Sequence, residues 1–343
     1  MAGKYSKKMD PKKKRIITIS CIVLAVLLII LLGLYIGFNI YLNSRLSRFP
    51  SGGETYPMDP SDMTADATDT IPVVSQAESI ITDGVVNILL VGQDRRAGEG
   101  RMHSDSMILV TINKKTKTLT MTSFMRDMWV YIPDRFNERI NVPYMLGGFD
   151  LLNSTLDYNF GVSGDYNVEI DFAGFMSAVD VIGGVEIELT SAEASYLNRR
   201  GNWDVEENVN WHLVEGTNLL TGSQALAYSR IRDIGDDFER TNRQRIVLTK
   251  LLDKAKTLSN AEVFSLIDEI LPMLTTDMTN NQIIGLALEM LPMLSDLQIV
   301  SQRIPMDGEY HFANKGGASV IGLTEENFER NKELLTDAMR VKQ

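Results

Sequence analysis

Apolar positions recur with two different periods between residues 83 and 343, and each period predicts one kind of element. Short apolar or alternating runs predict strands at residues 85–91, 106–112, 118–124, 166–171 and 185–189. Apolar positions spaced three or four apart predict helices at residues 172–182, 222–229, 238–256, 261–274 and 281–291. Strands interleaved with helices predict one α/β domain. It is expected to be an α-β-α sandwich, with a mixed, largely antiparallel central sheet flanked by helices.

The N-terminal segment has a pattern of its own. Residues 1–15 carry seven bases and one acid, and no charged residue occurs from 16 to 44. A bilayer span needs about 20 apolar residues, and basic flanks stay on the cytoplasmic side. The pattern therefore predicts a cytoplasmic tail at 1–15, a transmembrane helix at 16–42, and an extracytoplasmic C-terminal domain on a single-pass protein of the cell membrane. A cleaved signal peptide is the alternative, but its apolar core is shorter and ends in small residues.

Residues 43–82 lack a sustained period and are rich in Ser, Thr, Asp, Pro and Gly. This composition is typical of a solvated linker. We therefore expect a flexible extracytoplasmic stalk at 43–82 and a folded domain at 83–343, whose C-terminal part is helical.

Charge and cysteine content narrow the chemistry of the outer part. Residues 1–45 hold eight of the 34 bases and one of the 45 acids, which leaves 26 bases and 44 acids, a net charge of −18. Such an acidic domain is not expected to bind nucleic acid. The single cysteine, Cys21, lies in the predicted span, so the outer domain has neither disulfides nor thiol chemistry.

Arginine replaces lysine in the middle of the chain. No lysine occurs from residue 118 to residue 249, whereas arginines occupy positions 126, 135, 139, 199, 200, 230, 232, 240, 243 and 245. A guanidinium donates two parallel hydrogen bonds to a phosphate or a carboxylate, and a lysine ammonium does not. The pattern favours an anion site, while ordinary ion pairs on a solvated surface are the alternative, which we favour for Arg135, Arg139, Arg199 and Arg200.

Five of these arginines lie within residues 227–248, around a turn that contains two aspartates. If a helix begins near residue 238 with Asp236 or Asp237 as its cap, then Arg240, Arg243 and Gln244 share one face. Arg230 and Arg232 reach the same place if the preceding segment is extended. Several arginines would then converge on one anion.

Two carboxylates, Asp94 and Asp105, lie in the Gly-rich loop that follows the first predicted strand. Ligands collect at strand ends in α/β sheets, and carboxylate oxygens beside phosphates are what Mg²⁺ prefers. Turn capping is the alternative role. Zinc is not expected, because the three histidines are scattered and the outer domain has no cysteine.

Arg126 and Asp127 follow directly on the predicted strand at 118–124. At that position they belong to the edge of the sheet, and an exposed ion pair is the alternative to a role in the site.

Six motifs appear in order within residues 85–260. They are G-x-D-x-R (Gly92, Asp94, Arg96), S-D-S-M (104–107), R-D (Arg126, Asp127), I-N-x-x-Y-x-x-G-G (140–148), V-I-G-G-V (181–185), and R-x-R (Arg230, Arg232) followed by D-x-x-R-x-x-R-Q (237–244). In these motifs the chain resembles the LytR-CpsA-Psr family. That family attaches wall teichoic acids, capsular polysaccharides and related glycans to peptidoglycan in Gram-positive bacteria. The sequence departs from the family pattern at His103, Met125 and Glu239, where arginine, proline and glycine are usual.

The resemblance implies the roles of individual residues. Asp94 and Asp105 would hold Mg²⁺, and Asp237 would orient arginines or assist proton transfer. The pyrophosphate of a polyprenyl-linked glycan would be bound by Arg126, Arg230, Arg232, Arg240 and Gln244. The polyprenyl chain would lie in an apolar pocket, for which Phe172, Phe175, Met176 and Val179 are candidates, although ordinary core packing is the alternative.

The expected reaction is the attack of a peptidoglycan hydroxyl on the glycan-linked phosphorus, with polyprenyl phosphate as the leaving group. Such chemistry depends on positioning and charge neutralisation. Arg126, Asp127 and Asp237 are the catalytic candidates, and either aspartate is a candidate for the base. A pyrophosphatase that uses water as the acceptor is one alternative. A non-enzymatic wall-sensing or regulatory protein at the membrane is the other.

Overall fold

The computed structural model describes residues 36–48, 76–80, 82–93, 101–199 and 211–340 of the 343-residue chain. The chain divides into two units, Met1–Arg45 and Leu46–Gln343. In the first unit, residues 36–45 are helical. None of the helices in the described part of the chain has the length and apolarity that a membrane span requires. Most of the predicted span at 16–42 lies outside the described residues.

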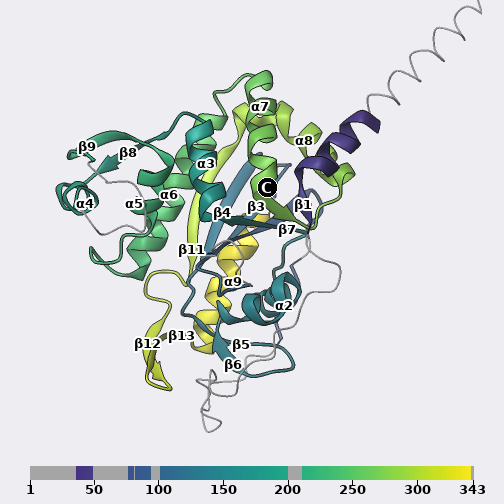
Figure 1. The fold of residues 1–343 in the computed structure, drawn as a ribbon. Helices are drawn as coiled ribbons and strands as arrows, with labels where there is room; N and C mark the ends of the chain where they lie inside the picture. Colours follow the sequence, from purple (N-terminus) through teal and green to yellow (C-terminus); the bar gives the residue numbers. More distant parts are fainter. Residues whose placement is uncertain (1–35, 49–75, 81, 94–100, 200–210, 341–343) are drawn as a thin grey trace, which may run out of the picture. The chain divides into compact units, whose positions relative to one another are not determined.

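The second unit is built on a seven-stranded sheet with the order β1-β10-β7-β2-β3-β4-β11 (Figure 1). Its strands are β1 (Ser47–Arg48), β2 (Val85–Gln93), β3 (Ser106–Asn113), β4 (Thr118–Phe124), β7 (Tyr166–Asp171), β10 (Leu274–Thr276) and β11 (Gln298–Ile304). The pairs β10–β7, β2–β3 and β3–β4 are antiparallel, while β1–β10, β7–β2 and β4–β11 are parallel. The mixed α/β fold is confirmed, but the sheet is evenly mixed rather than largely antiparallel.

Side chains of the sheet alternate between two apolar layers, as the pleat of a strand requires. On one face, Leu89 and Val91 pack with α2 (Val142–Phe160) and α9 (Glu325–Met339). On the other face, Ile88 and Leu90 lie in a cluster that includes Leu248 of α6 (Asp237–Ala255). Helices α7 (Asn260–Ile270) and α8 (Asn280–Met290) are each followed directly by a 3₁₀ turn, at Leu271–Met273 and Leu291–Asp296 respectively. The sheet is therefore buried on both faces.

A smaller apolar cluster lies beside α6. It is formed by the hairpin of β8 (Val185–Leu189) and β9 (Gly216–Leu220) with α3 (Phe172–Val181), α4 (Ser191–Leu197) and α5 (Gly222–Ser229). Asp171, Thr190, Thr221 and Asp236 accept a backbone N–H in the first turn of α3, α4, α5 and α6 respectively, which fixes where each helix begins.

The C-terminal part is not purely helical. The strands β10 and β11 extend the sheet at both sides, and a hairpin of β12 (His311–Lys315) and β13 (Ala318–Gly322) follows β11. A short hairpin of β5 (Trp129–Tyr131) and β6 (Asn137–Arg139) lies close to it. The expectation of a helical C-terminal part was therefore wrong for β10 to β13.

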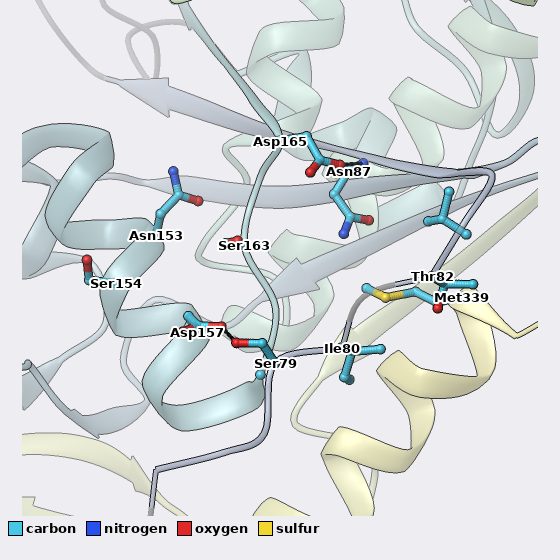
Figure 2. Close-up of a pocket in the computed structure, with 12 residues that line it drawn as sticks. Ser79, Ile80, Thr82, Asn87, Asn153, Ser154, Asp157, Ser163, Asp165 and Met339 are labelled. Carbon is cyan, nitrogen blue, oxygen red and sulfur yellow. Dashed lines mark hydrogen bonds between the residues drawn. The ribbon is translucent and has the colours of Figure 1, made fainter.

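The boundary predicted at residue 82 is also corrected, because the described residues before it pack on the domain. Ala77 and Ile80 donate their backbone N–H to the C=O of Tyr158 and Gly161, and the Ser79 hydroxyl lies 2.6 Å from an Asp157 carboxylate oxygen. Ser79 and Ile80 line one side of a polar cavity of ≈ 500 Å³, whose other lining residues come from Thr82, β2, α2, residues 161–165 and Met339 of α9 (Figure 2). The folded domain therefore includes residues 76–80.

Candidate functional site

One guanidinium joins three carboxylates at the end of β4. Arg126 Nη1 lies 3.0 Å from Asp105, Nη2 lies 3.6 Å from Asp237, and Nε lies 3.6 Å from Asp127. Asp105 directly precedes β3, Asp127 follows Arg126, and Asp237 opens α6. Three segments that are far apart in sequence thus meet at one edge of the sheet, and Arg126 is their common partner.

Arg240 lies one turn along α6, and its Nη2 is 2.8 Å from Asp237. Arg240 is only 3% exposed, and neither its Nε nor Asp237 Oδ2 has a hydrogen-bond partner among the described residues. Burial raises the pKa of Asp237, an effect that Arg240 and Arg126 oppose. Burial lowers the pKa of Arg240, and Asp237 opposes this shift. Arg240 Nε and Asp237 Oδ2 are thus a buried donor and a buried acceptor with no partner among the described residues. They lie at the N-terminus of α6, and a helix N-terminus favours anions.

A polar cavity of ≈ 310 Å³ opens at this cluster. Its lining residues are Met102, His103, Asp105, Arg126, Arg139 and Asn141. Arg139, on β6, lies 3.7 Å from Asp127, so it belongs to the same ionic network. Sequence reasoning had left Arg139 and His103 out of the site. The signal for Arg139 was its position directly before the motif at 140–148.

An apolar cavity of ≈ 110 Å³ lies between the sheet and α3, α5 and α6. Phe172 and Phe175 line it, together with Leu226, Ser229, Arg230, Gln244 and Leu248, among others. The Arg230 guanidinium lies over the Phe172 ring, 4.6 Å from its centroid. Of the other two pocket candidates, Val179 is fully buried in the cluster beside α6, and Met176 is partly buried on α3 outside the lining.

The two cavities are close to each other along the edge of the sheet, because the adjacent residues Asp105 and Ser106 line one each. Arg230 and Gln244 lie at the apolar cavity, whereas Arg126 lies at the polar one. Arg232 is exposed, and its positive charge acts to lower the pKa of Asp237 and the pKa of Arg240. Of the residues predicted for the anion site, the fold thus brings Arg126 and Arg240 together at Asp237, whereas Asp94 lies outside the described residues.

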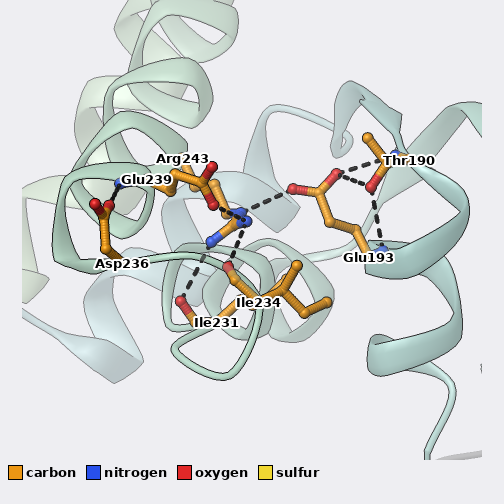
Figure 3. A network of polar contacts seen from close by, with 7 residues as sticks. All are labelled: Thr190, Glu193, Ile231, Ile234, Asp236, Glu239 and Arg243. Atoms are coloured by element: carbon orange, nitrogen blue, oxygen red, sulfur yellow. Dashed lines mark hydrogen bonds and ion pairs between the residues drawn. The ribbon is translucent and has the colours of Figure 1, made fainter.

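Arg243 has a different role from the other arginines, as Figure 3 shows. Its Nε donates to Glu193 at 2.8 Å, and its Nη atoms donate to the C=O groups of Ile231 and Ile234 at 3.3 and 3.0 Å. Burial alone would raise the pKa of Glu193, but hydrogen bonds from Thr190 and Arg243 lower it. Arg243 therefore holds residues 231–234, and with them Arg232, against α6.

We expect Arg243→Met and Glu193→Gln each to lower the free energy of unfolding by about 3 kcal/mol, because each leaves the charge of the other residue buried without its partner. The double variant should lose much less than the sum, since the two residues share one interaction. Urea unfolding of the four proteins measures this coupling. Additive losses would show that the contact in Figure 3 does not stabilise the fold.

Metal ligands are sparse in the described part of the chain. Within it, no group of three or more His, Cys, Asp or Glu side chains is placed to hold a metal ion. Asp105 is accessible at the polar cavity and uses one oxygen for Arg126. Mg²⁺ keeps several waters and is often held by one or two carboxylates and substrate phosphates. Asp105 therefore offers one carboxylate oxygen to a cation at the polar cavity, where substrate phosphates would have to supply further ligands.

Two curated relatives share part of the chain. The polyisoprenyl-teichoic acid–peptidoglycan teichoic acid transferase TagT of Bacillus subtilis (strain 168) is 31% identical over 218 residues, 62% of this chain and 65% of TagT. The regulatory protein MsrR of Staphylococcus aureus (strain COL) is 34% identical over 172 residues, 49% of each chain. This chain thus matches just under two thirds of TagT and about half of MsrR.

Solved structures share the fold. TagT bound to LIIa-WTA has a TM-score of 0.61 and 26% identity, over 78% of this chain and 97% of TagT. The LytR-CPS2A-psr family protein YwtF (TagT) with bound octaprenyl pyrophosphate lipid has a TM-score of 0.58 and 24% identity, over 78% and 97%.

The model of the LytR_cpsA_psr family matches residues 58–337, most of the chain and all of the site described above. The motifs that first suggested this resemblance lie within the matched range. The protein therefore belongs to the LytR-CpsA-Psr family.

Proposed function

We propose that this protein is a Mg²⁺-dependent phosphotransferase that moves a glycan phosphate from a polyprenyl-pyrophosphate-linked glycopolymer to peptidoglycan. The observation that carries the proposal is the ionic cluster of Arg126, Asp237 and Arg240 at a polar cavity, with an apolar cavity beside it that is lined by Gln244, one turn after Arg240 on α6. Such a substrate has an apolar chain, a doubly charged linkage and a polar glycan in this order. The transferase name of TagT, a relative, agrees with the proposal.

Each part of the substrate has a matching group in the protein. The polyprenyl end enters the apolar cavity beside Phe172 and Phe175. The pyrophosphate binds at the N-terminus of α6, where Arg240 adds a forked donor to the free backbone N–H groups. Arg126 lies at the polar cavity, where it neutralises the charge that develops on the reacting phosphorus.

In the proposed step, an acceptor hydroxyl oxygen forms a bond to the glycan-linked phosphorus. The bond from this phosphorus to the bridging oxygen breaks, and polyprenyl phosphate leaves with the electron pair. Asp237 takes the hydroxyl proton, because its raised pKa favours proton acceptance and its Oδ2 has no partner among the described residues. Asp127 instead shares both oxygens with Arg126 and Arg139, so we favour Asp237 over Asp127 as the base.

Asp105 would hold Mg²⁺ together with Asp94, which lies outside the described residues. When bound, the ion supplies positive charge to the phosphate oxygens. Arg126 orients the Asp105 carboxylate at the cavity. We propose this metal assignment from the donor chemistry and the family pattern.

We expect Asp105→Asn to raise the Mg²⁺ concentration for half-maximal transfer at least tenfold and to change the melting temperature little, because the residue lies at a cavity rather than in the core. A magnesium titration of transfer by parent and variant measures this. An unchanged titration would remove Asp105 from the metal site. A large fall in melting temperature, with no metal dependence, would point to a structural role.

We also propose that residues 1–15 are cytoplasmic, that residues 16–42 span the cell membrane, and that the domain lies outside. The basic tail and the uncharged apolar run support this. The anchor would keep the domain at the surface from which a polyprenyl chain can enter the apolar cavity.

The test of the proposed function is a reaction of the purified full chain with a polyprenyl-pyrophosphate-linked glycan and peptidoglycan. A covalent glycan–peptidoglycan product, together with polyprenyl phosphate, supports the transferase. Release of free glycan phosphate alone would identify a pyrophosphatase. Absence of any turnover would favour a regulatory role, as the name of the relative MsrR suggests for that protein.

A further inference from the structure

Three aromatic rings and one arginine form a surface cluster next to the site, here called the aromatic platform. Phe238 stacks on Tyr310 at 4.8 Å, and Phe312 meets Phe238 and Tyr310 edge-on at 6.4 and 5.6 Å. The guanidinium of Arg303 lies over Phe238, 4.2 Å from the ring centroid. Phe312 is 65% exposed, although it is large and apolar. An exposed ring beside an arginine is typical of a binding surface.

The platform is tied to the catalytic cluster by two separate connections. Phe238 directly follows Asp237, in the first turn of α6. The hairpin β12–β13, which carries Phe312, is fixed to the other side of the cluster, because the Ile321 N–H donates to the Asp127 C=O at 2.9 Å. The platform therefore adjoins two of the three acidic residues that pair with Arg126, namely Asp127 and Asp237.

Two arginines, Arg303 and Arg245, lie close to one acid, Asp307, at the platform. Arg303 pairs with Asp307, yet its Nη1 has no hydrogen-bond partner in the described part of the chain. Behind it, Arg245 is 7% exposed, and its Nε and Nη1 also have no partner there. Burial, and then the charge of Arg303, lower the pKa of Arg245 to about 10. Two arginines thus share one acid, which favours an anionic ligand.

Helix α6 presents different faces to the platform and to the apolar cavity. Gln244 and Leu248, four residues apart, share the face that lines the cavity. Phe238 and Arg245, seven residues apart, share a different face. In a phosphoryl transfer, the attacking and leaving oxygens lie on opposite sides of the phosphorus. Because the leaving polyprenyl phosphate belongs to the cavity side of α6, the acceptor is expected from the platform side.

We propose that the aromatic platform binds the acceptor, a peptidoglycan glycan strand, so that its hydroxyl is directed to the site. This inference rests on the proposed function. The rings of Phe312 and Tyr310 offer apolar faces to the C–H faces of sugar rings. The positive charge of Arg303 attracts the carboxylates that peptidoglycan carries on its peptide stems. Donor glycan on the same surface is the alternative outcome of the test.

The first experiment measures binding without turnover. The detergent-solubilised full chain is sedimented with purified peptidoglycan sacculi from which attached glycopolymers have been removed. Phe312→Ala should bind about tenfold more weakly, a loss of about 1.4 kcal/mol and within the range for an aromatic contact residue. Leu288→Ala on α8, which removes a side chain that is 66% exposed, is the matched control and should bind like the parent.

A second measurement separates the acceptor from the donor. Phe312→Ala should raise the KM for a soluble peptidoglycan acceptor about tenfold and leave the Kd for the polyprenyl-linked glycan unchanged. Equal binding of sacculi by parent and Phe312→Ala, or no binding by the parent, would overturn the inference. A change confined to donor binding would assign the platform to the donor glycan. If the parent binds sacculi through Phe312 but transfers nothing, the platform stands and the transferase proposal fails.

Discussion

Replacement of Arg126 by lysine is expected to lower the rate of glycan transfer about 10²–10³-fold, which is the loss typical of removing one preorganised donor to transition-state charge. Arg126 places three nitrogens against Asp105, Asp127 and Asp237. A lysine ammonium is one point charge and cannot hold three carboxylates in this arrangement. The substitution should lower kcat as well as kcat/KM, because the transferred phosphoryl group loses a donor that acts on it in the transition state.

The measurement for Arg126 is steady-state transfer with saturating donor, together with a thermal melt. Arg126 is partly exposed, so we expect little loss of stability. Arg135→Lys is the matched control, since Arg135 is an exposed arginine a few residues away from the site. Parent-like turnover of Arg126→Lys would show that a positive charge alone suffices. Equal losses in both variants would show that the effect is not specific to the site.

Replacement of Arg240 by lysine should weaken the binding of polyprenyl-pyrophosphate glycan by about 1–3 kcal/mol, the usual worth of a hydrogen bond to a charged group. Arg240 is 3% exposed and lies in the first turn of α6, with its Nη2 2.8 Å from Asp237. Lysine keeps the charge but loses the second donor of the fork. Binding of the donor and its transfer should therefore fall together, whereas the fold is retained.

Arg240→Ala is the comparison that separates charge from geometry. If Arg240→Lys bound and transferred like the parent while Arg240→Ala did not, charge alone would suffice and the forked geometry would be irrelevant. If both variants behaved like the parent, the anion site would have to be rebuilt around Arg126, Arg230 and Arg232. A direct measurement of donor affinity in detergent, beside the turnover assay, distinguishes these cases.

The elements that sequence reasoning missed have identifiable physical reasons. Within α2, Gly147 and Gly148 leave helical geometry, and Pro143 stands in its first turn, so the apolar period is interrupted. The strand β11 is polar at several positions because it lies at the edge of the sheet, and only its parallel pairing with β4 makes it a strand. Helix α9 is largely charged, with Phe328 and Leu335 among its few buried residues.

The amino-acid sequence by itself determined the features that depend on neighbours in the chain. These features are the periods of β2, β3, β4 and β7, the N-terminus of α6 beside Asp236, and the arginine-rich motif at 230–245. Each is local, because strand alternation, helix faces and caps involve residues a few positions apart.

Only the tertiary structure decided which charges meet. Arg126 and Asp237 are more than a hundred positions apart, and a helix packed on a sheet brings them within 3.6 Å. The same packing turned Arg243 inward to Glu193, left Arg232 exposed, and placed Phe312 beside the site. A guanidinium that binds a ligand and one that clamps a loop have the same local pattern. What separates them is the partner that long-range packing supplies, and no local period encodes that partner.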